Sequence, residues 1–244
     1  MPFGAPDFSN IRKEALVHRL DDLAEASVRT FIPVLYDRLG DVIYFNGFES
    51  GMLSGTVSST DPSDRFAIGY GCGYCSNRAL VHIKPANVTG TIDLKQIIPR
   101  YATQTVGFSI FLRRGQYANS NAFWLRVASS GGVVSFGLKL DYSTPSIWIT
   151  GPVGWVKIAN LTTHDVYFNQ WLWIKFVGNI SKRSWVRVMF NVHAYDLRLY
   201  NTPFDPTPAP SSIQVIISED TSNTNEYRAF FDNLIVTINE PVSD

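Results

Sequence analysis

Hydrophobic and polar side chains alternate along most of the chain from residue 42 onward, with the period of two that is typical of β-strands. Such alternation indicates strands with one buried face and one outer face, as in antiparallel sheets. No periodic segment of helix length lies between these strands, which argues against a parallel α/β fold. We therefore predict an all-β protein, an antiparallel two-sheet jelly-roll sandwich. The side chains expected to point inward are Val106, Phe108, Ile110, Leu112, Phe123, Leu125, Val127, Phe136, Leu138, Leu140, Leu172, Ile174, Phe176, Val186, Val188, Phe190 and Val192.

The N-terminal segment has a different pattern, which predicts a helix over residues 9–32 that ends at Pro33. Its narrow apolar stripe consists of Leu16, Leu20, Leu23 and Phe31. A short helix of this kind needs a surface to pack on, either its own sandwich or a neighbouring subunit. We expect residues 1–40 to form a helical arm that makes a homo-oligomer or larger assembly, and residues 41–244 to form the sandwich.

The charge pattern excludes several classes of protein. The chain has 21 basic and 21 acidic residues, and no run of Lys and Arg that would neutralise phosphates, so we expect no nucleic-acid partner. No apolar stretch approaches the roughly 20 residues that span a bilayer, so we expect no membrane span. The N-terminus lacks the basic-then-apolar pattern of a classical signal peptide.

Short motifs at both ends of the predicted sandwich resemble a known superfamily. Residues 43–51, with the sequence IYFNGFESG, resemble the opening strand of secreted carbohydrate-binding sandwiches, and residues 230–237, FFDNLIVT, resemble their closing strand. The order of strands between them is similar to that of concanavalin-A-like and laminin-G-like domains. The resemblance covers about residues 42–240 and implies the jelly-roll fold and sugar binding.

The resemblance also implies a structural calcium site. In such sandwiches the opening Glu and the closing Asp often bind Ca²⁺, which here implies Glu49 and Asp232, with backbone carbonyls near Gly51 completing the shell. Oxygen-only ligands suit this ion. The alternative is that Glu49 caps a strand and Asp232 begins a turn.

Large aromatic and cationic residues occupy the outward positions of several predicted strands. If these strands lie in one sheet, they form a platform for a glycan or for another subunit; a second core layer covered by the arm or by loops is the alternative. Trp148 and Trp155 flank the turn at residues 150–152, and we expect them to pack within a hairpin. The candidate ligand-binding residues are Trp124, Arg126, Trp171, Trp173, Lys175, Trp185 and Arg187.

No catalytic motif is visible in the sequence. Cys72 and Cys75 are two residues apart but lack the βαβ context of a redox motif, so we expect a local disulfide or two inert thiols. There is no nucleophile elbow G-x-S-x-G, and no Glu-x-Asp-x-Glu strand like that of sandwich-fold glucanases. We therefore predict no catalytic residues and a protein that is not an enzyme.

Three functions remain open at this stage. The leading hypothesis is a non-catalytic structural or assembly subunit of an external particle or surface structure, such as a virion capsid or decoration protein. It implies a location on a virion or outside the cell. The second is a lectin-like carbohydrate-binding module that uses the tryptophan face. The third is a polysaccharide hydrolase or lyase with an unrecognised site.

Overall fold

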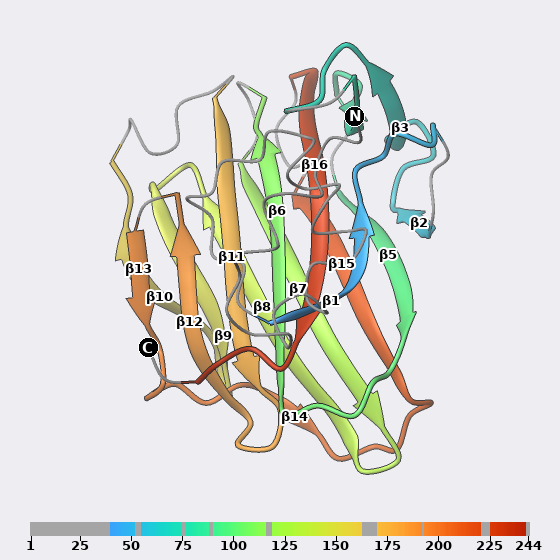
Figure 1. Cartoon of the computed structure of the whole chain (residues 1–244). Helices are drawn as coiled ribbons and strands as arrows, with labels where there is room; N and C mark the ends of the chain where they lie inside the picture. The colour runs from blue at the N-terminus through green and yellow to red at the C-terminus, as the bar shows by residue number, and fades with distance from the viewer. Residues whose placement is uncertain are drawn as a thin grey trace, which may run out of the picture.

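A computed structural model describes residues 40–51, 55–74, 77–87, 90–115, 119–162, 170–191, 193–220 and 225–242. Within these ranges the chain is all β, in two antiparallel sheets that stack as a sandwich (Figure 1). No helix in them is long and apolar enough to cross a membrane. The predicted helical arm, with Leu16, Leu20, Leu23 and Phe31, lies outside the described residues, so its structure and its role in assembly stay predictions.

The first sheet, sheet A, has the strand order β13-β12-β11-β6-β16-β4-β3, and β1 pairs with the second half of β16. β16 can hold both β4 and β1 on one edge because β4 pairs with its residues 227–231 and β1 with its residues 234–238. The strands of sheet A are β1 (Asp41–Asn46), β3 (Arg65–Tyr70), β4 (Arg78–Lys84), β6 (Thr105–Arg113), β11 (Trp171–Asn179), β12 (Ser184–Phe190), β13 (His193–Asp196) and β16 (Tyr227–Ile238).

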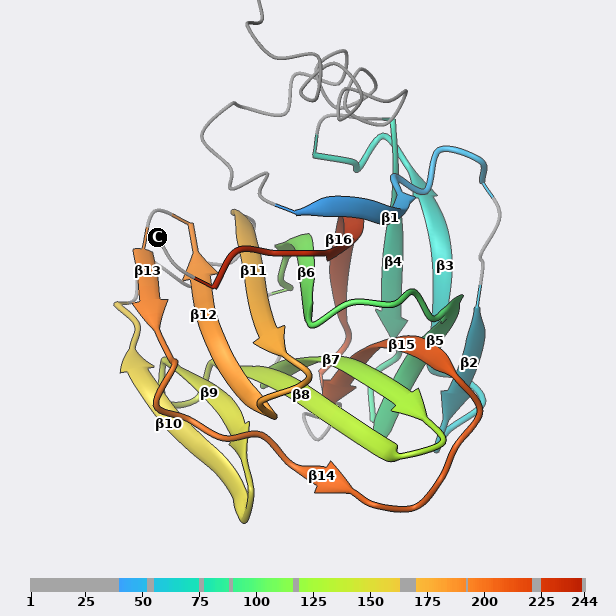
Figure 2. The same ribbon diagram turned by 60° about the horizontal axis from the view of Figure 1, so that its bottom comes forward.

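The second sheet, sheet B, has the strand order β10-β9-β8-β7-β15-β5-β2, and the short β14 pairs with the start of β8. Figure 2 shows it as the lower of the two layers. The strands of sheet B are β2 (Thr56–Ser59), β5 (Thr91–Pro99), β7 (Ser120–Ser129), β8 (Gly132–Asp141), β9 (Ser146–Gly151), β10 (Gly154–Asn160), β14 (Phe204–Asp205) and β15 (Ser212–Asp220).

The hydrophobic core fills the space between the two sheets, as the alternation predicts. Every residue expected to point inward is buried, apart from Val192, which lies outside the described residues. Aromatic contacts join the layers: the ring of Phe123 in sheet B lies 5.8 Å from that of Phe108 and 6.2 Å from that of Phe231, both in sheet A. The prediction of an antiparallel two-sheet sandwich is confirmed.

Strand β12 departs from the predicted alternation. Val177 of β11 pairs with Arg187 of β12 but Gly178 pairs with Trp185, so Val186 is an extra residue in β12 and reverses the face of the side chain before it. Trp185, expected on the outside, is therefore fully buried in the core. Its ring packs against Phe136 and Phe176, and its Nε1 donates a hydrogen bond of 2.9 Å to the Thr150 carbonyl. The predicted outward position of Trp185 is wrong.

Candidate functional site

The outer face of sheet B carries tryptophan side chains from neighbouring strands. The residues on either side of Trp124 in β7 are buried in the core, so Trp124 itself points outward. The strand register aligns it with Gly137 of β8, while Thr150 of β9 is aligned with Trp155 of β10. Gly137 and Thr150 are adjacent, since the Gly137 amide donates a 2.9 Å hydrogen bond to the Thr150 hydroxyl. Trp124 and Trp155 thus belong to one row across the sheet.

Gly137 makes room for the Trp124 ring in this row. A Cβ at position 137 would lie 2.6 Å from two atoms of the Trp124 indole and 2.7 Å from the methyl group of Thr150. The glycine therefore permits the indole to lie over β8, a close approach that a larger side chain would prevent. As a result the Trp124 and Trp155 rings meet edge to face, with their centroids 5.2 Å apart.

The next row of the same face combines a tryptophan with two lysines. Lys139 of β8 is aligned with Trp148 of β9, which is aligned with Lys157 of β10. The Nζ atom of Lys139 lies 5.3 Å from the Trp148 ring centroid and 5.4 Å from that of Trp155, and Lys157 Nζ lies 6.0 Å from Trp148. The Trp148 Nε1 donates a 2.8 Å hydrogen bond to Ser146 Oγ, which fixes the orientation of the indole.

Arg126 extends this surface along β7, with its guanidinium carbon 5.3 Å from the Trp124 ring centroid. The three tryptophans, Arg126 and Lys139 are all half-buried, and Lys157 is exposed. Rigid aromatic rings that remain partly open to solvent beside cations form a surface suited to binding. We call this surface the indole–cation patch, and it consists of Trp124, Arg126, Lys139, Trp148, Trp155 and Lys157.

The cations of the patch have aromatic neighbours rather than acidic ones. In the part of the chain that the structure describes, Arg126, Lys139 and Lys157 form no ion pair, and the buried Nε of Arg126 has no hydrogen-bond partner. Asp141, at the end of β8, is the carboxylate whose pKa responds to Lys139. Its Oδ1 accepts hydrogen bonds from Ser143 and Thr144 in the β8–β9 turn.

The outer face of sheet A carries similar residues, but there they are buried. Trp173, Lys175 and Arg187 are only 4%, 2% and 7% exposed. The C-terminal segment contacts Lys175 and Arg187: the carboxylate of Glu240 is 2.8 Å from Lys175 Nζ and 2.9 Å from Arg187 Nη2. Arg187 also donates a 2.8 Å hydrogen bond to the Pro241 carbonyl. This face is a second buried layer, the alternative that the sequence left open.

Trp171, at the start of β11, also lies on the sheet A side. Its ring is half-buried, 5.7 Å from the Tyr74 ring, and the Arg113 guanidinium lies 5.3 Å from it. Tyr74 in turn stacks on Phe111 at 4.2 Å. The loop after β3 thus packs against this part of the face, and Trp171 is half-buried there, on the sheet opposite to the one that carries Trp124.

The residues predicted to bind a ligand therefore lie in three different places. Trp124 and Arg126 lie in the patch, Trp185 is in the core, and the remaining members are on sheet A. The residues of the patch that were not predicted from the sequence are Trp148, Trp155, Lys139 and Lys157. The available signal was the position of Trp148 between Ile147 and Ile149, which predicts an outward tryptophan, but the sheet order that joins it to Trp124 is not visible in the sequence.

The carboxylates of the predicted calcium site have other partners. Asp232 is buried and accepts hydrogen bonds from the amides of Tyr74 at 2.8 Å and Asn233 at 2.7 Å. Glu49 accepts a 2.9 Å hydrogen bond from the Arg78 amide, and its carbonyl accepts one from the Arg78 guanidinium.

The Arg78 guanidinium also lies beside Gly51, where an added Cβ would be 2.5 Å from its Nη1. A positive charge is thus present at the carbonyls that were expected to complete the calcium shell. A second cation would be repelled there, so these residues do not fit Ca²⁺. Among the described residues, no group of three or more His, Cys, Asp or Glu side chains could hold a metal ion.

The predicted cysteine pair is only partly within the described chain. Cys72 carries a free, half-buried thiol, and burial raises its pKa. Cys75 lies outside the described residues, so the state of the pair stays a prediction. A thiol with a raised pKa is a weak nucleophile at neutral pH.

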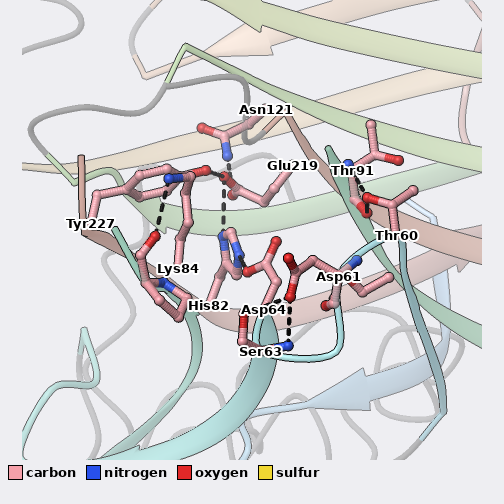
Figure 3. A network of polar contacts seen from close by, with 12 residues as sticks. Thr60, Asp61, Ser63, Asp64, His82, Lys84, Thr91, Asn121, Glu219 and Tyr227 are labelled. Atoms are coloured by element: carbon pink, nitrogen blue, oxygen red, sulfur yellow. Dashed lines mark hydrogen bonds and ion pairs between the residues drawn. The ribbon is translucent and has the colours of Figure 1, made fainter. Parts of the chain in front are cut away.

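A charged network lies inside the sandwich, around His82 of β4 (Figure 3). His82 Nε2 is 2.5 Å from Asp64 Oδ1 and its Nδ1 is 3.5 Å from Glu219 Oε2, with all three side chains at most 1% exposed. Glu219 also accepts hydrogen bonds from the hydroxyl of Tyr227, at 3.2 Å, and from the amide of Asn121. His82 and Tyr227 belong to sheet A, whereas Glu219 and Asn121 belong to sheet B, so the network links the two sheets.

Burial disfavours the charged form of His82, but the hydrogen bond to Asp64 and the nearby Glu219 carboxylate outweigh it and raise the pKa of His82 to about 9. The imidazolium is therefore the form expected at neutral pH, held between two carboxylates. Because solvent does not reach these three side chains, the network supports the fold rather than a reaction with a ligand.

No protein-family model and no curated protein matches the chain. Solved structures do share its architecture. A carbohydrate esterase, vb_24B_21, from the Shiga toxin-encoding bacteriophage phi24B matches with a TM-score of 0.52 and 14% identity, over 80% of this chain and 95% of the other. The cellulose induced protein Cip1 matches with a TM-score of 0.51 and 11% identity, over 80% and 96%.

The chain shares the fold of these proteins, a two-sheet antiparallel jelly-roll β-sandwich. The resemblance read from the two ends of the sandwich is thereby confirmed for the fold. The lectin I-B4 from Griffonia simplicifolia also matches, with a TM-score of 0.47 and 11% identity, over 76% of this chain and 100% of the other. At these identities the likeness concerns the jelly-roll fold alone.

Proposed function

We propose that this protein is a carbohydrate-binding module and that the indole–cation patch is its binding surface. The observation that carries the proposal is the cluster of Trp124, Trp148 and Trp155 on the outer face of sheet B, half-buried and locked by their neighbours. The apolar faces of sugar rings stack on flat aromatic rings. Rings that are already fixed lose little conformational freedom when a ligand binds.

The shape of the patch suits an extended ligand. Trp155 and Trp124 belong to one row of the sheet and Trp148 to the next, so that rings are presented along and across the strands. A chain of linked sugars can contact more than one of them. The fold supports the proposal, because jelly-roll sandwiches that resemble this chain include a carbohydrate esterase and a cellulose induced protein by name.

Binding to polysaccharides tests the proposal most directly. Affinity electrophoresis in gels that contain a panel of neutral and acidic polysaccharides should show retarded migration of the wild-type protein in at least one. Trp148→Ala should abolish most of this retardation because it removes a central ring. Trp171→Ala is the matched control, since Trp171 lies on the sheet A side beneath Tyr74. Wild-type migration that no polysaccharide alters, or equal effects of the two variants, would refute the proposed surface.

The other functions have weaker support in the described residues. The assembly hypothesis rests on the arm, which lies outside them. For the hydrolase or lyase alternative, the cluster of Asp64, His82 and Glu219 is enclosed and has no access to a polysaccharide. Glycan binding is therefore the function that the geometry supports best.

A further inference from the structure

The indole–cation patch differs in charge from the chain as a whole. The protein has no net charge, with 21 basic and 21 acidic residues. On the outward positions of β7, β8, β9 and β10, however, three cations face one carboxylate, that of Asp141 at the edge of the patch. That carboxylate is engaged by the β8–β9 turn through Ser143 and Thr144. With Asp141 counted, the patch keeps a net positive charge, and none of its three cations forms an ion pair among the described residues.

Each indole of the patch has a cation next to it. Arg126 lies beside Trp124, Lys139 lies between Trp148 and Trp155, and Lys157 lies near Trp148. A sugar ring that stacks on any of these indoles therefore brings its substituents close to a positive charge. The cation–π contacts hold the side chains in place but do not neutralise them.

We propose that the ligand of the patch is an acidic polysaccharide whose rings carry carboxylate or sulfate groups. This inference rests on the proposed function, because it specifies the substrate class of the same surface. An anionic substituent would form charge-assisted hydrogen bonds with Lys139, Lys157 or Arg126, which are stronger than those between neutral groups. A neutral sugar offers these cations only hydroxyl oxygens, which accept hydrogen bonds but supply no counter-charge.

On the opposite face of the sandwich, the cations are neutralised by a carboxylate of the same chain. Lys175 and Arg187 occupy comparable outward positions on sheet A, and both are paired with Glu240. The three cations of the patch have no such partner among the described residues. An external anion would supply the counter-charge that these three cations lack.

The first experiment compares two polymers that differ only in charge. Isothermal titration of the full chain with polygalacturonate should show binding, and the same polymer after reduction of its carboxyl groups should bind roughly tenfold or more weakly. Raising the salt from about 0.05 M to about 0.5 M should weaken binding to the acidic polymer alone, because salt screens charges.

The outcomes separate the two proposals. Equal binding of both polymers, lost in Trp148→Ala, would overturn the acidic ligand and leave the carbohydrate-binding function in place. If neither polymer binds, a sulfated galactan is the second acidic probe, and its binding would identify sulfate as the anionic group. If no acidic polymer binds while a neutral polysaccharide does, the acidic ligand is overturned; if no polysaccharide binds, both proposals fail.

Charge variants locate the effect on the surface. Lys139→Gln should weaken binding of the acidic polymer by roughly three- to tenfold, and should weaken binding of the reduced polymer less than that. Lys182→Gln removes the same charge from the exposed β11–β12 turn and should have no effect. Equal effects of the two variants would show nonspecific attraction by total charge. Single-stranded DNA that binds as tightly as the acidic polysaccharide would instead assign the patch to nucleic acid.

Discussion

The outer faces of the two sheets begin from the same residue types and reach opposite states. Each face presents tryptophans and cations at alternating positions of neighbouring strands. On sheet A, the C-terminal segment and the loop containing Tyr74 cover them, and Glu240 neutralises Lys175 and Arg187. On sheet B, the indoles stay half-buried, and the cations contact aromatic rings and form no ion pair among the described residues. The difference shows that aromatic and cationic residues in an outward register do not by themselves mark a binding surface.

The covering segment explains why one face is structural. A buried cation is stable when a carboxylate compensates for its lost hydration, and a single residue, Glu240, does this for two cations. Its carboxylate also accepts a hydrogen bond from the hydroxyl of Thr237. On the sheet B face, no carboxylate of the described residues forms an ion pair with Arg126, Lys139 or Lys157, and these cations remain available to an anion from outside.

Neutralising Glu240 is expected to have the largest effect on the stability of the sheet A face. Glu240→Gln would leave Lys175 and Arg187 buried without a counter-charge, and we expect a loss of roughly 3–5 kcal/mol in the free energy of unfolding. Denaturant titration measures it. Asp196→Asn serves as the control, because the Asp196–Arg198 pair is 58% exposed on both sides and contributes little. A cost below about 1 kcal/mol for Glu240→Gln would show that the sheet A face is not held by this charge.

A matched pair of tryptophan variants compares the two faces directly. Trp173→Ala, on sheet A, removes a ring that is 4% exposed and should cost about 3–5 kcal/mol of stability. Trp148→Ala, in the indole–cation patch, should cost about 1 kcal/mol, since half-buried rings lose less contact. Thermal or denaturant unfolding of both variants measures these losses in the free energy of unfolding. Similar costs would mean that the two faces are equally structural.

The network between the sheets predicts a pH dependence of stability. The pKa of His82 is raised from its ordinary value of 6.5 to about 9. The stabilisation of the fold by the charged imidazolium is therefore fully present below pH 6.5 and is lost as the pH rises through about 9. The expected loss is about 3 kcal/mol, which denaturant titrations at about pH 6 and about pH 9.5 would measure. His82→Gln should remove most of this slope, whereas His193→Gln, at an exposed position, should retain it. A wild-type stability that is flat over this range would show that His82 is neutral in the fold.

The smallest effect is expected from removal of calcium. Because the Arg78 guanidinium lies against the Glu49 carbonyl and Gly51, a chelator should leave the melting temperature unchanged. Differential scanning calorimetry with chelator and with excess Ca²⁺ measures this. A melting temperature that falls with chelator and recovers with Ca²⁺ would show that Glu49 and Asp232 do hold the ion, by mass action on the folded state.

Much of the fold can be predicted from the sequence, because alternation is a local property. The inward residues of β6, β7, β8 and β11 are buried as their period of two requires. Trp185 fails because the register of β11 and β12 shifts at Val177, an irregularity that depends on pairing with another strand. One shifted residue moves a side chain to the opposite face of a sheet.

The candidate site could be predicted only in part for a related reason. Trp124 and Arg126 were identified as outward residues, and both lie in the patch. Trp148 and Trp155 were assigned to hairpin packing, and the β9–β10 hairpin does contain them. The hairpin pattern does not show which strand lies beside the hairpin. That strand is β8, which brings Lys139 to both indoles, and its Gly137 leaves room for Trp124 to contact Trp155.

By itself, then, the sequence determined the class of fold and the face on which most side chains lie, because these follow from local periodicity and side-chain chemistry. Only the tertiary structure decided which outward residues are neighbours and which are covered. Those properties depend on the order of strands and on where Glu240 and Tyr74 pack, contacts between residues far apart in the chain. For that reason, residues of the same types form a buried layer on one sheet and a half-exposed patch on the other.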